Sequence, residues 1–311
     1  MKAVLIGTGG WGKNHARILS QLGVLTAICD TDDEKRKEFG KKYSVNSYKN
    51  FNEMLESENF DAAFVCTPTN THYQIATQLI QEKKDVFVEK PMTYLSEDGQ
   101  KLIELAKKNK VVLTCGYIER FNPAVDVVKK IVHEKKYGDL VMLEFHRENR
   151  MPLHIKDVGI IYDTSVHDID TANWLFNEMP QVVFARSGKI RHEREDFTNI
   201  MLGYKNDKVA IISSNWITPK KVRKFSAVCT EAIISSDFLT QEIKVERDED
   251  SEIIQNEKQE PLMREIQNFL DSIKDKSKQI VKANEAVNVT KIAEAALLSS
   301  QKGTPIYLDL K

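Results

Sequence analysis

Short apolar runs alternate with amphipathic segments over the first 120 residues of the chain. Five apolar runs are bounded by Gly, Asp, Asn or Pro, at residues 2–6, 24–29, 62–66, 86–88 and 111–115. Between them, apolar residues recur at helical spacing in three stripes, at residues 18–22, 75–80 and 102–106. Continuous apolar strands that alternate with amphipathic helices are typical of a parallel sheet covered by helices on both faces. This region is therefore predicted to be a domain of the α/β class.

The pattern changes after Gly116. Asn122-Pro123 is a helix cap followed by a first-turn proline, and the apolar stripe after it predicts a helix closed by Gly138. From about residue 139 to 246, the helical signal is confined mainly to residues 164–176. Strands are predicted in this region at residues 141–145, 182–185, 209–213 and 232–235, among others. Strands joined by short connections indicate an antiparallel or mixed sheet.

The C-terminal part begins with a charged stretch, residues 246–260, which we expect to be a solvated hairpin tip or loop. Two helices are predicted near residues 262–273 and 285–300, and Gly303-Thr304-Pro305 is a stop signal. We place the domain boundary near residue 120. The expected organisation is an α/β domain over residues 1–120 and an α+β domain over residues 121–311, the latter with an open, mainly antiparallel sheet.

The composition limits the class of protein. At 311 residues, with 41% hydrophobic and 29% charged residues, the chain is long enough for two domains with apolar cores. The 45 Lys and Arg residues nearly balance 46 Asp and Glu residues, so the net charge of −1 gives no overall field for holding nucleic acid or anionic lipid. No apolar run is long enough to span a membrane, and the first is too short for a signal peptide. We therefore expect a cytoplasmic protein with no nucleic-acid or membrane partner.

The spacing of cysteine and histidine argues against a disulfide framework or a structural metal. The cysteines form no Cys-x-x-Cys pair, and they lie at positions 29, 66, 115 and 229. Three of them end apolar runs, where a thiol packs as a small buried hydrophobe. No paired metal-ligand spacing links the histidines at positions 15, 133, 146, 154 and 192. We expect reduced cysteines and no bound metal.

A glycine motif follows the first predicted strand. Gly7, Gly9 and Gly12 form Gly-x-Gly-x-x-Gly between that strand and the first predicted helix. In dinucleotide-binding Rossmann domains the first glycine permits a tight turn, the second lets the backbone approach a pyrophosphate, and the third lets helix and strand pack closely. Asp30 ends the second predicted strand, where an acid binds the ribose 2′-hydroxyl. Because no basic residue follows Asp30 directly, NAD is expected in preference to NADP.

Three further segments lie at the carboxyl ends of later predicted strands, where ligands bind in open α/β sheets. They are Thr67-Pro68-x-x-x-His72, Glu89-Lys90-Pro91 and Gly116-Tyr117-x-x-Arg120-Phe121. A fourth pattern, Asp163-x-x-x-His167, lies at the start of the helix predicted in the second domain. Together these motifs resemble the glucose–fructose oxidoreductase/inositol dehydrogenase (Gfo/Idh/MocA) family of NAD(P)-dependent sugar oxidoreductases over nearly the whole chain. One departure is that residues 154–159 stand where members often carry a glycine cluster.

The residue types suit the chemistry of a dehydrogenase. Oxidising a secondary alcohol moves a hydride to the nicotinamide while a base removes the hydroxyl proton. Asp163 and His167, four residues apart at a helix start, would share one face, where a carboxylate can fix the imidazole tautomer. A lysine beside the alcohol stabilises the developing alkoxide. The resemblance assigns the catalytic roles to Lys90, Asp163 and His167.

The same motifs supply the candidate binding residues. For the cofactor they are Gly7, Gly9, Gly10, Trp11, Gly12, Asp30, Thr67, Pro68, Thr69, His72, Glu89 and Lys90. For the substrate they are Lys90, Tyr117, Arg120, Asn122, Arg150, Lys156, Asp163 and His167. Alternatives stay open: Lys90 could be a solvated surface lysine, and the Asp/His pair a helix-terminal acid with a buried imidazole. The cations Arg120, Arg147, Arg150 and Lys156 could bind an anionic substrate or be solvated, and His72 is expected to line the pocket without catalysing.

Within the family, residues 119–125, 157–159 and 167–170 look most like the nucleotide-sugar branch, which includes UDP-N-acetylglucosamine 3-dehydrogenases. That branch oxidises the C3 hydroxyl of the sugar. An inositol or free-sugar dehydrogenase is the alternative reaction. A catalytically inactive nicotinamide-binding regulator and a scaffolding subunit are alternatives of another class. The intact candidate residues of the catalytic and cofactor sites argue against both.

The second predicted sheet also bears on assembly. The strands at residues 209–212 and 232–235 are apolar at successive positions, and the region has too few helices to cover both faces. A bare apolar face would exceed what monomers usually expose. We therefore expect a homodimer or homotetramer formed through this sheet, unless the 246–260 segment or the C-terminal helices cover it.

Overall fold

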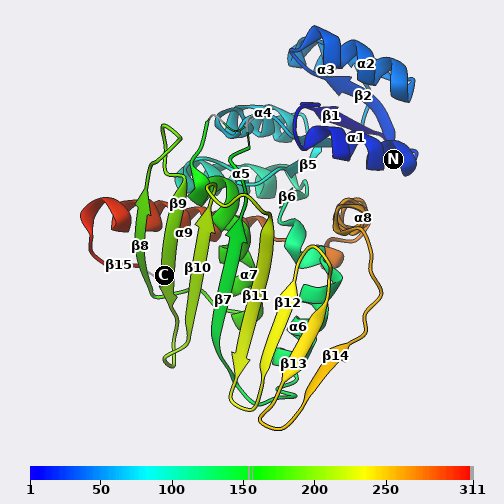
Figure 1. The fold of residues 1–311 in the computed structure, drawn as a ribbon. Helices are drawn as coiled ribbons and strands as arrows, with labels where there is room; N and C mark the ends of the chain where they lie inside the picture. Colours follow the sequence, from blue (N-terminus) through cyan, green and yellow to red (C-terminus); the bar gives the residue numbers. More distant parts are fainter. Residues whose placement is uncertain (153–154, 156, 309–311) are drawn as a thin grey trace. The chain divides into compact units, whose positions relative to one another are not determined.

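The computed structural model describes residues 1–152, 155 and 157–308, and these form two compact units (Figure 1). The first unit contains Met1–Gly116 and Leu262–Val287, and the second contains Tyr117–Pro261 and the chain from Asn288 onward. The expected single boundary at residue 120 therefore needs correction. It lies near the first crossing between the units, but residues 262–287 return to the first unit.

The first unit is built on a six-stranded parallel sheet in the order β3-β2-β1-β4-β5-β6. The strands are β1 (Ala3–Ile6), β2 (Leu25–Cys29), β3 (Asn46–Tyr48), β4 (Ala62–Val65), β5 (Asp85–Val88) and β6 (Leu113–Cys115). Every residue of β1 and β4 is buried, which requires cover on both faces of the sheet. The α/β prediction is confirmed. The edge strand β3 was not predicted, because its residues are polar and mostly exposed.

Helices alternate with these strands along the chain. They are α1 (Gly12–Gln21), α2 (Asp33–Tyr43), α3 (Phe51–Ser57), α4 (Thr69–Gln81) and α5 (Ser96–Asn109). The three predicted stripes lie in α1, α4 and α5. The first helix ends before Gly23, whose φ of +67° suits glycine. Helix α4 begins at Thr69, and its N-cap position is Pro68, which makes no side-chain cap.

Helix α8 (Pro261–Lys274) belongs with the first unit for a packing reason. Its Phe269 ring meets Phe64 of β4 edge-on at 5.2 Å between centroids, and Phe87 of β5 at 5.7 Å. The short helix η3 (Lys276–Lys278) and the first turns of α9 (Ala283–Lys302) follow. Contacts between segments far apart in the sequence leave no periodic pattern along the chain. The sequence therefore did not predict that residues 262–287 return to the first unit.

The second unit contains a nine-stranded mixed sheet in the order β14-β13-β12-β11-β7-β10-β9-β8-β15. Its strands are β7 (Leu140–Glu148), β8 (Val182–Gly188), β9 (Phe197–Gly203), β10 (Val209–Asn215), β11 (Val222–Cys229), β12 (Ile233–Asp237), β13 (Ile243–Glu246), β14 (Ser251–Ile254) and β15 (Ile306–Tyr307). Among the described residues, β7 and β10 form the parallel pair of this sheet and the other pairs are antiparallel. The expectation of a mainly antiparallel sheet is confirmed.

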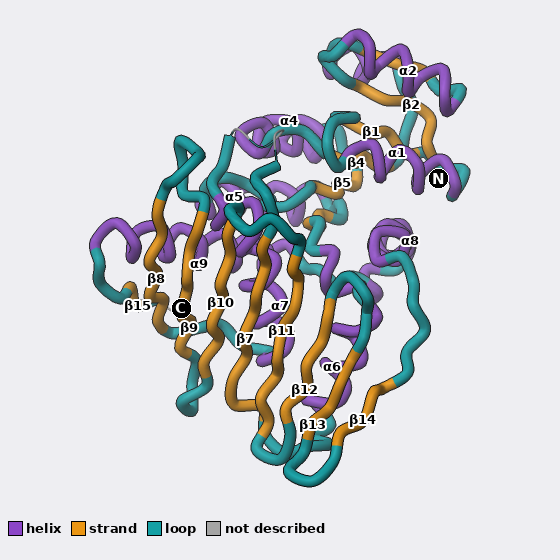
Figure 2. Tube along the Cα trace, in the orientation of Figure 1, coloured by secondary structure: helices purple, strands orange, loops and turns teal. Residues whose placement is uncertain are grey.

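Helices cover one face of this sheet (Figure 2). Buried and partly exposed residues alternate along β10, with Ala210 and Ile212 fully buried and Ile211 on the opposite face. Helix α6 (Pro123–His133) packs against β12, and α7 (Val166–Phe176) packs against β7 and β10. Alternate residues of these apolar strands therefore differ in burial. The residues on the helix-covered face form the core, and those on the opposite face are partly exposed.

Several helix signals of the second unit correspond to the structure. The Asn122 carboxamide oxygen accepts a hydrogen bond from Ala124 N at 3.1 Å and Pro123 is the first helical residue of α6, as predicted. The helix ends at His133, earlier than the predicted stop at Gly138, because Lys135 already adopts a left-handed conformation with φ of +53°. The chain between β6 and α6 forms a short 3-10 helix, η1 (Ile118–Phe121).

The charged stretch after residue 246 is part of a hairpin. Strands β13 and β14 pair in antiparallel register, and the Arg247 guanidinium meets the Asp250 carboxylate at the tip in a two-point ion pair of 2.7 and 2.9 Å. Residues 247–250 are the hairpin tip and residues 255–260 form a loop, so both expected forms are present in this stretch. Over the described residues, no helix combines the length and apolar character needed to cross a membrane.

Candidate active site

The glycine loop after β1 has the geometry that a dinucleotide requires. A Cβ added to Gly7, whose φ is +90°, would lie 2.5 Å from the Cys66 carbonyl oxygen, and a Cβ at Gly12 would overlap the carbonyl oxygen of Gly7. A Cβ at Gly9 meets nothing within 4 Å. The first and third glycines are thus required by the protein's own packing, whereas the second leaves space beside the backbone for a ligand. Trp11, exposed at 45%, stands at the N-terminus of α1.

Asp30 lies directly after β2 and is held against the glycine loop. Its Oδ2 accepts hydrogen bonds from Thr8 N at 2.7 Å and from the Thr8 hydroxyl at 2.6 Å, and its Oδ1 accepts one from Asp32 N at 2.9 Å. A carboxylate has four lone-pair positions, so these three bonds leave acceptor capacity for a ribose hydroxyl. The predicted hydrogen bond from a ribose hydroxyl to Asp30 stays a prediction.

The loop after β4 is held by His72. One ring nitrogen of this buried imidazole lies 2.9 Å from the Thr67 carbonyl oxygen and the other lies 2.9 Å from the Pro91 carbonyl oxygen. His72 therefore ties the Thr67-Pro68-Thr69 loop to the segment after β5. At 1% exposure the imidazole has little surface for a ligand, so its structural role here is to join the two loops, and its predicted role as a pocket-lining residue stays a prediction.

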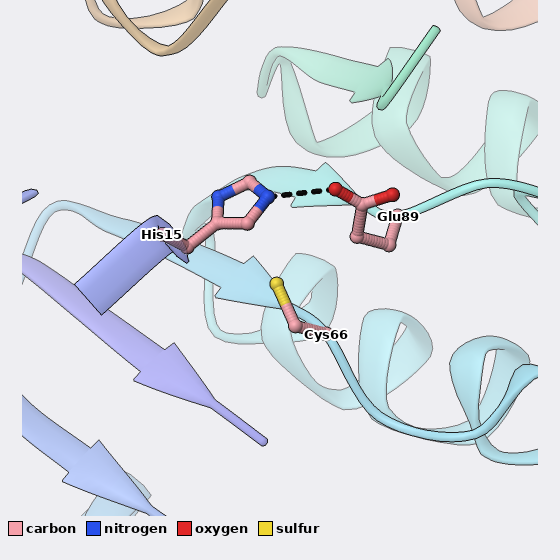
Figure 3. Close-up of side chains that lie close together, drawn as sticks. All are labelled: His15, Cys66 and Glu89. Atoms are coloured by element: carbon pink, nitrogen blue, oxygen red, sulfur yellow. Dashed lines mark hydrogen bonds and ion pairs between the residues drawn. The ribbon is translucent and has the colours of Figure 1, made fainter. Parts of the chain in front are cut away.

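Glu89 directly follows β5 inside the unit and connects Lys90 to helix α1. The His15 Nε2 atom lies 2.6 Å from Glu89 Oε1, and Glu89 Oε2 accepts a hydrogen bond from Lys90 N at 3.0 Å (Figure 3). Gly116 closes the other side, since a Cβ there would lie 2.9 Å from Glu89 Oε2. Glu89 thus fixes the backbone at Lys90. Glu89 was predicted to contact the cofactor, but at 7% exposure its side chain is too enclosed to be a direct ligand.

A third side chain of a type that can bind metals, Cys66, lies close to His15 and Glu89. The Cys66 thiol completes a group whose ligand atoms lie within 4.8 Å of one another (Figure 3). Burial raises the pKa of the Cys66 thiol well above its ordinary value, and the Glu89 charge adds to this. The expectation of no bound metal stays a prediction, because a bound cation would itself remove the proton of a coordinating thiol. Between His15 and Glu89 the structure shows a hydrogen bond of 2.6 Å.

In the second unit, Asp163 and His167 differ from their neighbours in burial. They are the two residues between Val158 and Ala172 that are not buried. Asp163 lies in a π-helical turn (Ile161–Ser165) that leads directly into α7, which carries His167. The predicted helix is therefore present but begins with a wider turn, a feature that often occurs at functional sites. Both side chains are partly exposed in an otherwise buried segment, and their shared face stays a prediction.

Neighbouring side chains fix this turn to the sheet. Trp216, buried after β10, donates its indole N–H to the Thr164 hydroxyl at 3.2 Å. The Ser165 and Ser214 hydroxyls are 3.0 Å apart, and the Thr164 hydroxyl donates to Asp163 Oδ2 at 3.1 Å. The π-helical turn is thereby held over the carboxyl end of β10, and its position does not depend on backbone bonds alone.

A buried ion-pair network lies beneath this segment. Arg147 of β7 donates from Nε and Nη2 to Asp168, the residue after His167, at 3.0 and 2.8 Å, and from Nη1 to Glu119 at 3.0 Å. Burial alone would lower the pKa of Arg147, but the charges of Asp168 and Glu119 outweigh it and raise that pKa. Arg147 is 1% exposed, so it orients α7 and does not present a charge to a substrate.

Two predicted substrate residues need the same correction. Arg120 is 4% exposed and binds Asp170 through Nε and Nη2 at 2.9 and 2.6 Å. Asn122 caps α6 and also donates its amide to Glu119 Oε2 at 3.2 Å and to the Phe238 carbonyl at 3.0 Å. These groups hold the fold of the second unit. The charged and polar side chains of Arg120 and Asn122 predicted contact with a substrate. In the structure they bind other residues of the protein.

The remaining predicted substrate residues differ in their surroundings. Tyr117 is buried, at 1% exposure. Arg150 is exposed in the loop after β7 and donates to the Ile217 carbonyl at 3.2 Å. Lys156 lies outside the described residues. Arg150 therefore stays a candidate for substrate contact, whereas Tyr117 has little surface to offer.

Sequence reasoning missed two residues that the structure brings out. His15 was considered only as a metal ligand, although its place one turn into α1 predicts a side chain facing the sheet. Arg223 was not singled out. It shares the period-2 positions of the buried Phe225 and Ala227 on β11, and a cation at such a position is a detectable signal.

Comparisons with known proteins agree with this geometry. A model described as the oxidoreductase family with an NAD-binding Rossmann fold matches residues 1–117, and the GFO/IDH/MocA C-terminal domain model matches residues 125–235. Myo-inositol 2-dehydrogenase of Thermotoga maritima is 29% identical over 229 residues, covering 69% of this chain and 68% of the relative. UDP-N-acetylglucosamine 3-dehydrogenase of Acidithiobacillus ferrooxidans is 24% identical and covers 88% of each chain.

The solved structure of that last enzyme, GnnA, superposes with a TM-score of 0.89 at 23% identity, covering 97% of this chain and 98% of that one. At this identity the likeness establishes the fold. The two family models together span both units, and the glycine loop has the space that a dinucleotide needs. The chain therefore belongs to the Gfo/Idh/MocA oxidoreductase family, with an NAD-binding Rossmann domain and the family's C-terminal domain.

Proposed function

We propose that this protein is an NAD-dependent dehydrogenase that oxidises the C3 hydroxyl of a nucleotide-activated sugar such as UDP-N-acetylglucosamine. The observation that carries the proposal is the partial exposure of Asp163 and His167 within a segment that is otherwise buried. A family member without catalysis has no need to keep a partly exposed acid and imidazole in a buried segment. This argues against the inactive-regulator alternative.

Each proposed catalytic residue has a distinct role. His167 removes the hydroxyl proton, because a neutral imidazole is the side chain best matched to that task near neutral pH. Asp163 orients the imidazole and stabilises the imidazolium that forms. Lys90 stabilises the alkoxide, and its backbone is fixed by Glu89 for that purpose. When bound, NAD supplies the acceptor for the hydride.

The glycine loop and Asp30 are the proposed NAD contacts. Gly9 allows close approach of a pyrophosphate, and α1 presents its N-terminal N–H groups beside that loop. Asp30 would accept from the ribose diol, and its negative charge disfavours a 2′-phosphate. We therefore propose NAD as the preferred cofactor over NADP.

The substrate proposal rests on the nucleotide-sugar resemblance of residues 119–125, 157–159 and 167–170, together with the relative from Acidithiobacillus ferrooxidans. A second candidate is inositol oxidation, which the 29% identity to myo-inositol 2-dehydrogenase favours. A screen of NAD reduction over UDP-sugars, free sugars and inositols separates the two. Turnover of inositol without turnover of any UDP-sugar would replace the first proposal by the second.

The catalytic roles have their own test. Lys90→Ala and His167→Ala should each lower the rate by about 10²–10⁴-fold, the usual contribution of a group acting on the proton or the alkoxide. NAD affinity, measured by calorimetry, should stay almost unchanged, because neither residue is proposed to contact the adenosine end. Retention of more than about a tenth of the rate would remove that residue from the catalytic role.

We also propose that the open face of the second sheet forms a contact between copies of the chain. Apolar side chains remain on this face, with Met201 exposed at 41%, Ile233 at 44% and Ile253 at 63%. A symmetric contact would bury them in a dimer, or in a tetramer with a second interface. Light scattering at micromolar concentration tests this, and a monomer of 35.6 kDa would contradict it.

A further inference from the structure

Two basic residues lie at the start of β11, Arg223 within the strand and Lys221 just before it. The buried positions of this strand alternate as Phe225, Ala227 and Cys229, so Arg223 lies on the same, helix-covered side by period 2. Arg223 is half-buried, and Lys221 is exposed. Both lie near the end of the sheet where β7 and β10 terminate.

The neighbour of Arg223 across the strand pair is another arginine. Register places Arg223 opposite Arg147 of β7, which in turn is opposite Ser214 of β10. Arg147 already uses the carboxylates of Asp168 and Glu119. Arg147 therefore binds both of these carboxylates. The positive charge of Arg223 is left for a ligand.

Arg223 lacks an internal partner that would explain its burial. In the part of the chain that the structure describes, its Nε is buried without a hydrogen-bond acceptor, and none of the ion pairs includes Arg223 or Lys221. A buried guanidinium N–H is normally satisfied, because leaving it without an acceptor costs free energy. An acceptor supplied by a ligand would satisfy it.

The charges around Arg223 include the proposed catalytic acid. Burial lowers the pKa of Arg223 and the charge of Arg147 lowers it further, while Glu119, Asp168 and Asp163 act in the opposite direction. Burial likewise lowers the pKa of Lys221, and both arginines add to this. These cations therefore disfavour one another, and Asp163 is close enough to act on Arg223. An anion bound among them would relieve the repulsion.

We infer that Arg223 and Lys221 form an anion subsite that binds phosphate oxygens of the substrate, beside the turn that carries Asp163. This inference rests on the proposed function, since it takes Asp163 and His167 as the reacting end. A guanidinium fork donates two parallel hydrogen bonds to phosphate, and a lysine adds a flexible point charge. A sugar carrying a phosphoryl group therefore suits the subsite, whereas inositol and free sugars offer it nothing.

Titration of UDP into the NAD-loaded full-length protein tests the subsite directly. Arg223→Gln should weaken UDP binding by about tenfold or more, the usual value of a charge-assisted hydrogen bond to phosphate. Lys221→Gln should have a smaller effect, and Arg223→Lys should retain part of the affinity. N-acetylglucosamine 1-phosphate distinguishes the sources: the same dependence on Arg223 places the subsite at the phosphoryl group nearest the sugar, and dependence for UDP alone places it further along the diphosphate.

Lys224→Gln is the matched control. Lys224 lies one residue further along β11 on the opposite face, where it pairs with Asp237 at 3.9 Å, so this variant should bind UDP like the wild type. In turnover, Arg223→Gln should raise KM for UDP-N-acetylglucosamine by a larger factor than it lowers kcat.

The outcomes separate the subsite from the proposed function. A folded Arg223→Gln variant with UDP affinity within about twofold of wild type overturns the subsite. Wild-type oxidation of UDP-N-acetylglucosamine with a KM unaffected by Arg223→Gln also overturns it and leaves the function standing. Arginine-dependent UDP binding without oxidation of any UDP-sugar supports the subsite and overturns the proposed reaction.

Discussion

The two units hold their candidate site residues by different physical means. In the first unit, Asp30 and Glu89 are fixed by a few hydrogen bonds from backbone N–H groups, a hydroxyl and an imidazole. In the second, the segment that carries Asp163 and His167 lies over buried arginine–carboxylate pairs. A loop that must accept a dinucleotide needs space and backbone donors, whereas a helix that must present an acid and a base needs a rigid support. Substitutions should therefore affect the two units unequally.

The largest effect is expected at a buried ion pair of the second unit. Asp170→Asn removes the charge that Arg120 faces while both groups are almost fully buried. Breaking such a pair leaves an uncompensated charge in the interior, and the free energy of unfolding should fall by about 3–5 kcal/mol. Urea unfolding measures this. A loss below about 1 kcal/mol would mean that hydrogen bonding, not charge, supports the helix.

A smaller effect is expected from crowding Glu89 in the first unit. Gly116→Ala places a Cβ 2.9 Å from Glu89 Oε2, which should displace the carboxylate from His15 and lower stability by about 1–3 kcal/mol. Turnover should fall as well, because the backbone of Lys90 moves with Glu89. Gly9→Ala is the matched control, since its Cβ meets nothing within 4 Å. It should keep full stability in thermal unfolding and lose NAD affinity.

Removing the imidazole of His15 tests the same support from the other side. His15→Ala leaves Glu89 Oε1 without its 2.6 Å contact in a buried position, which should cost about 1–3 kcal/mol of stability. The expected kinetic signature is a lower kcat with an unchanged KM for NAD. His15→Gln, whose amide can donate to the carboxylate, should recover part of the rate; equal losses in the two variants would contradict a hydrogen-bonding role.

Asp30→Ala should alter cofactor choice and should also lower stability by about 1–3 kcal/mol, because the buried Thr8 loses the acceptor of its N–H and hydroxyl hydrogen bonds. Losing an acceptor for the ribose diol should weaken NAD binding by about tenfold or more and narrow the gap between NAD and NADP. Calorimetric titration of both cofactors into both proteins measures the change. Tighter binding of NADP than NAD by the wild-type protein would show that Asp30 does not select the cofactor.

The smallest effect is expected where the same ion-pair geometry is exposed. Arg247 and Asp250 make a two-point contact at the β13–β14 hairpin tip, with bond lengths close to those of Arg120 and Asp170. Solvent screens this pair, so Asp250→Asn should leave the urea midpoint unchanged. A measurable loss would mean that the contact between the two charges, and not burial, governs the stability of the second unit.

Much of the first unit follows from local pattern. The apolar runs predict β1, β2, β4, β5 and β6, because strands buried on both faces must be apolar throughout. The glycine spacing predicts the loop from residue types a few positions apart, whereas the close approach of Cys66 that leaves no room for a Cβ at Gly7 comes from the tertiary fold. By contrast, β3, α2 and α3 are largely polar and exposed, so hydrophobic periodicity could not reveal them.

The sequence by itself determined the class of the sheets, the dinucleotide loop, the Asn122 cap and the spacing of Asp163 and His167, because all of these depend on neighbours along the chain. Only the tertiary structure decided which charges are internal. Arg120 and Arg147 find carboxylates on α7, whereas Arg223, on the same face of the sheet, finds none. The return of α8 to the first unit is decided in the same way, by aromatic contacts between distant segments. A residue type states what a side chain can bind, but the partners that three-dimensional packing supplies decide whether that capacity is used internally or left for a ligand.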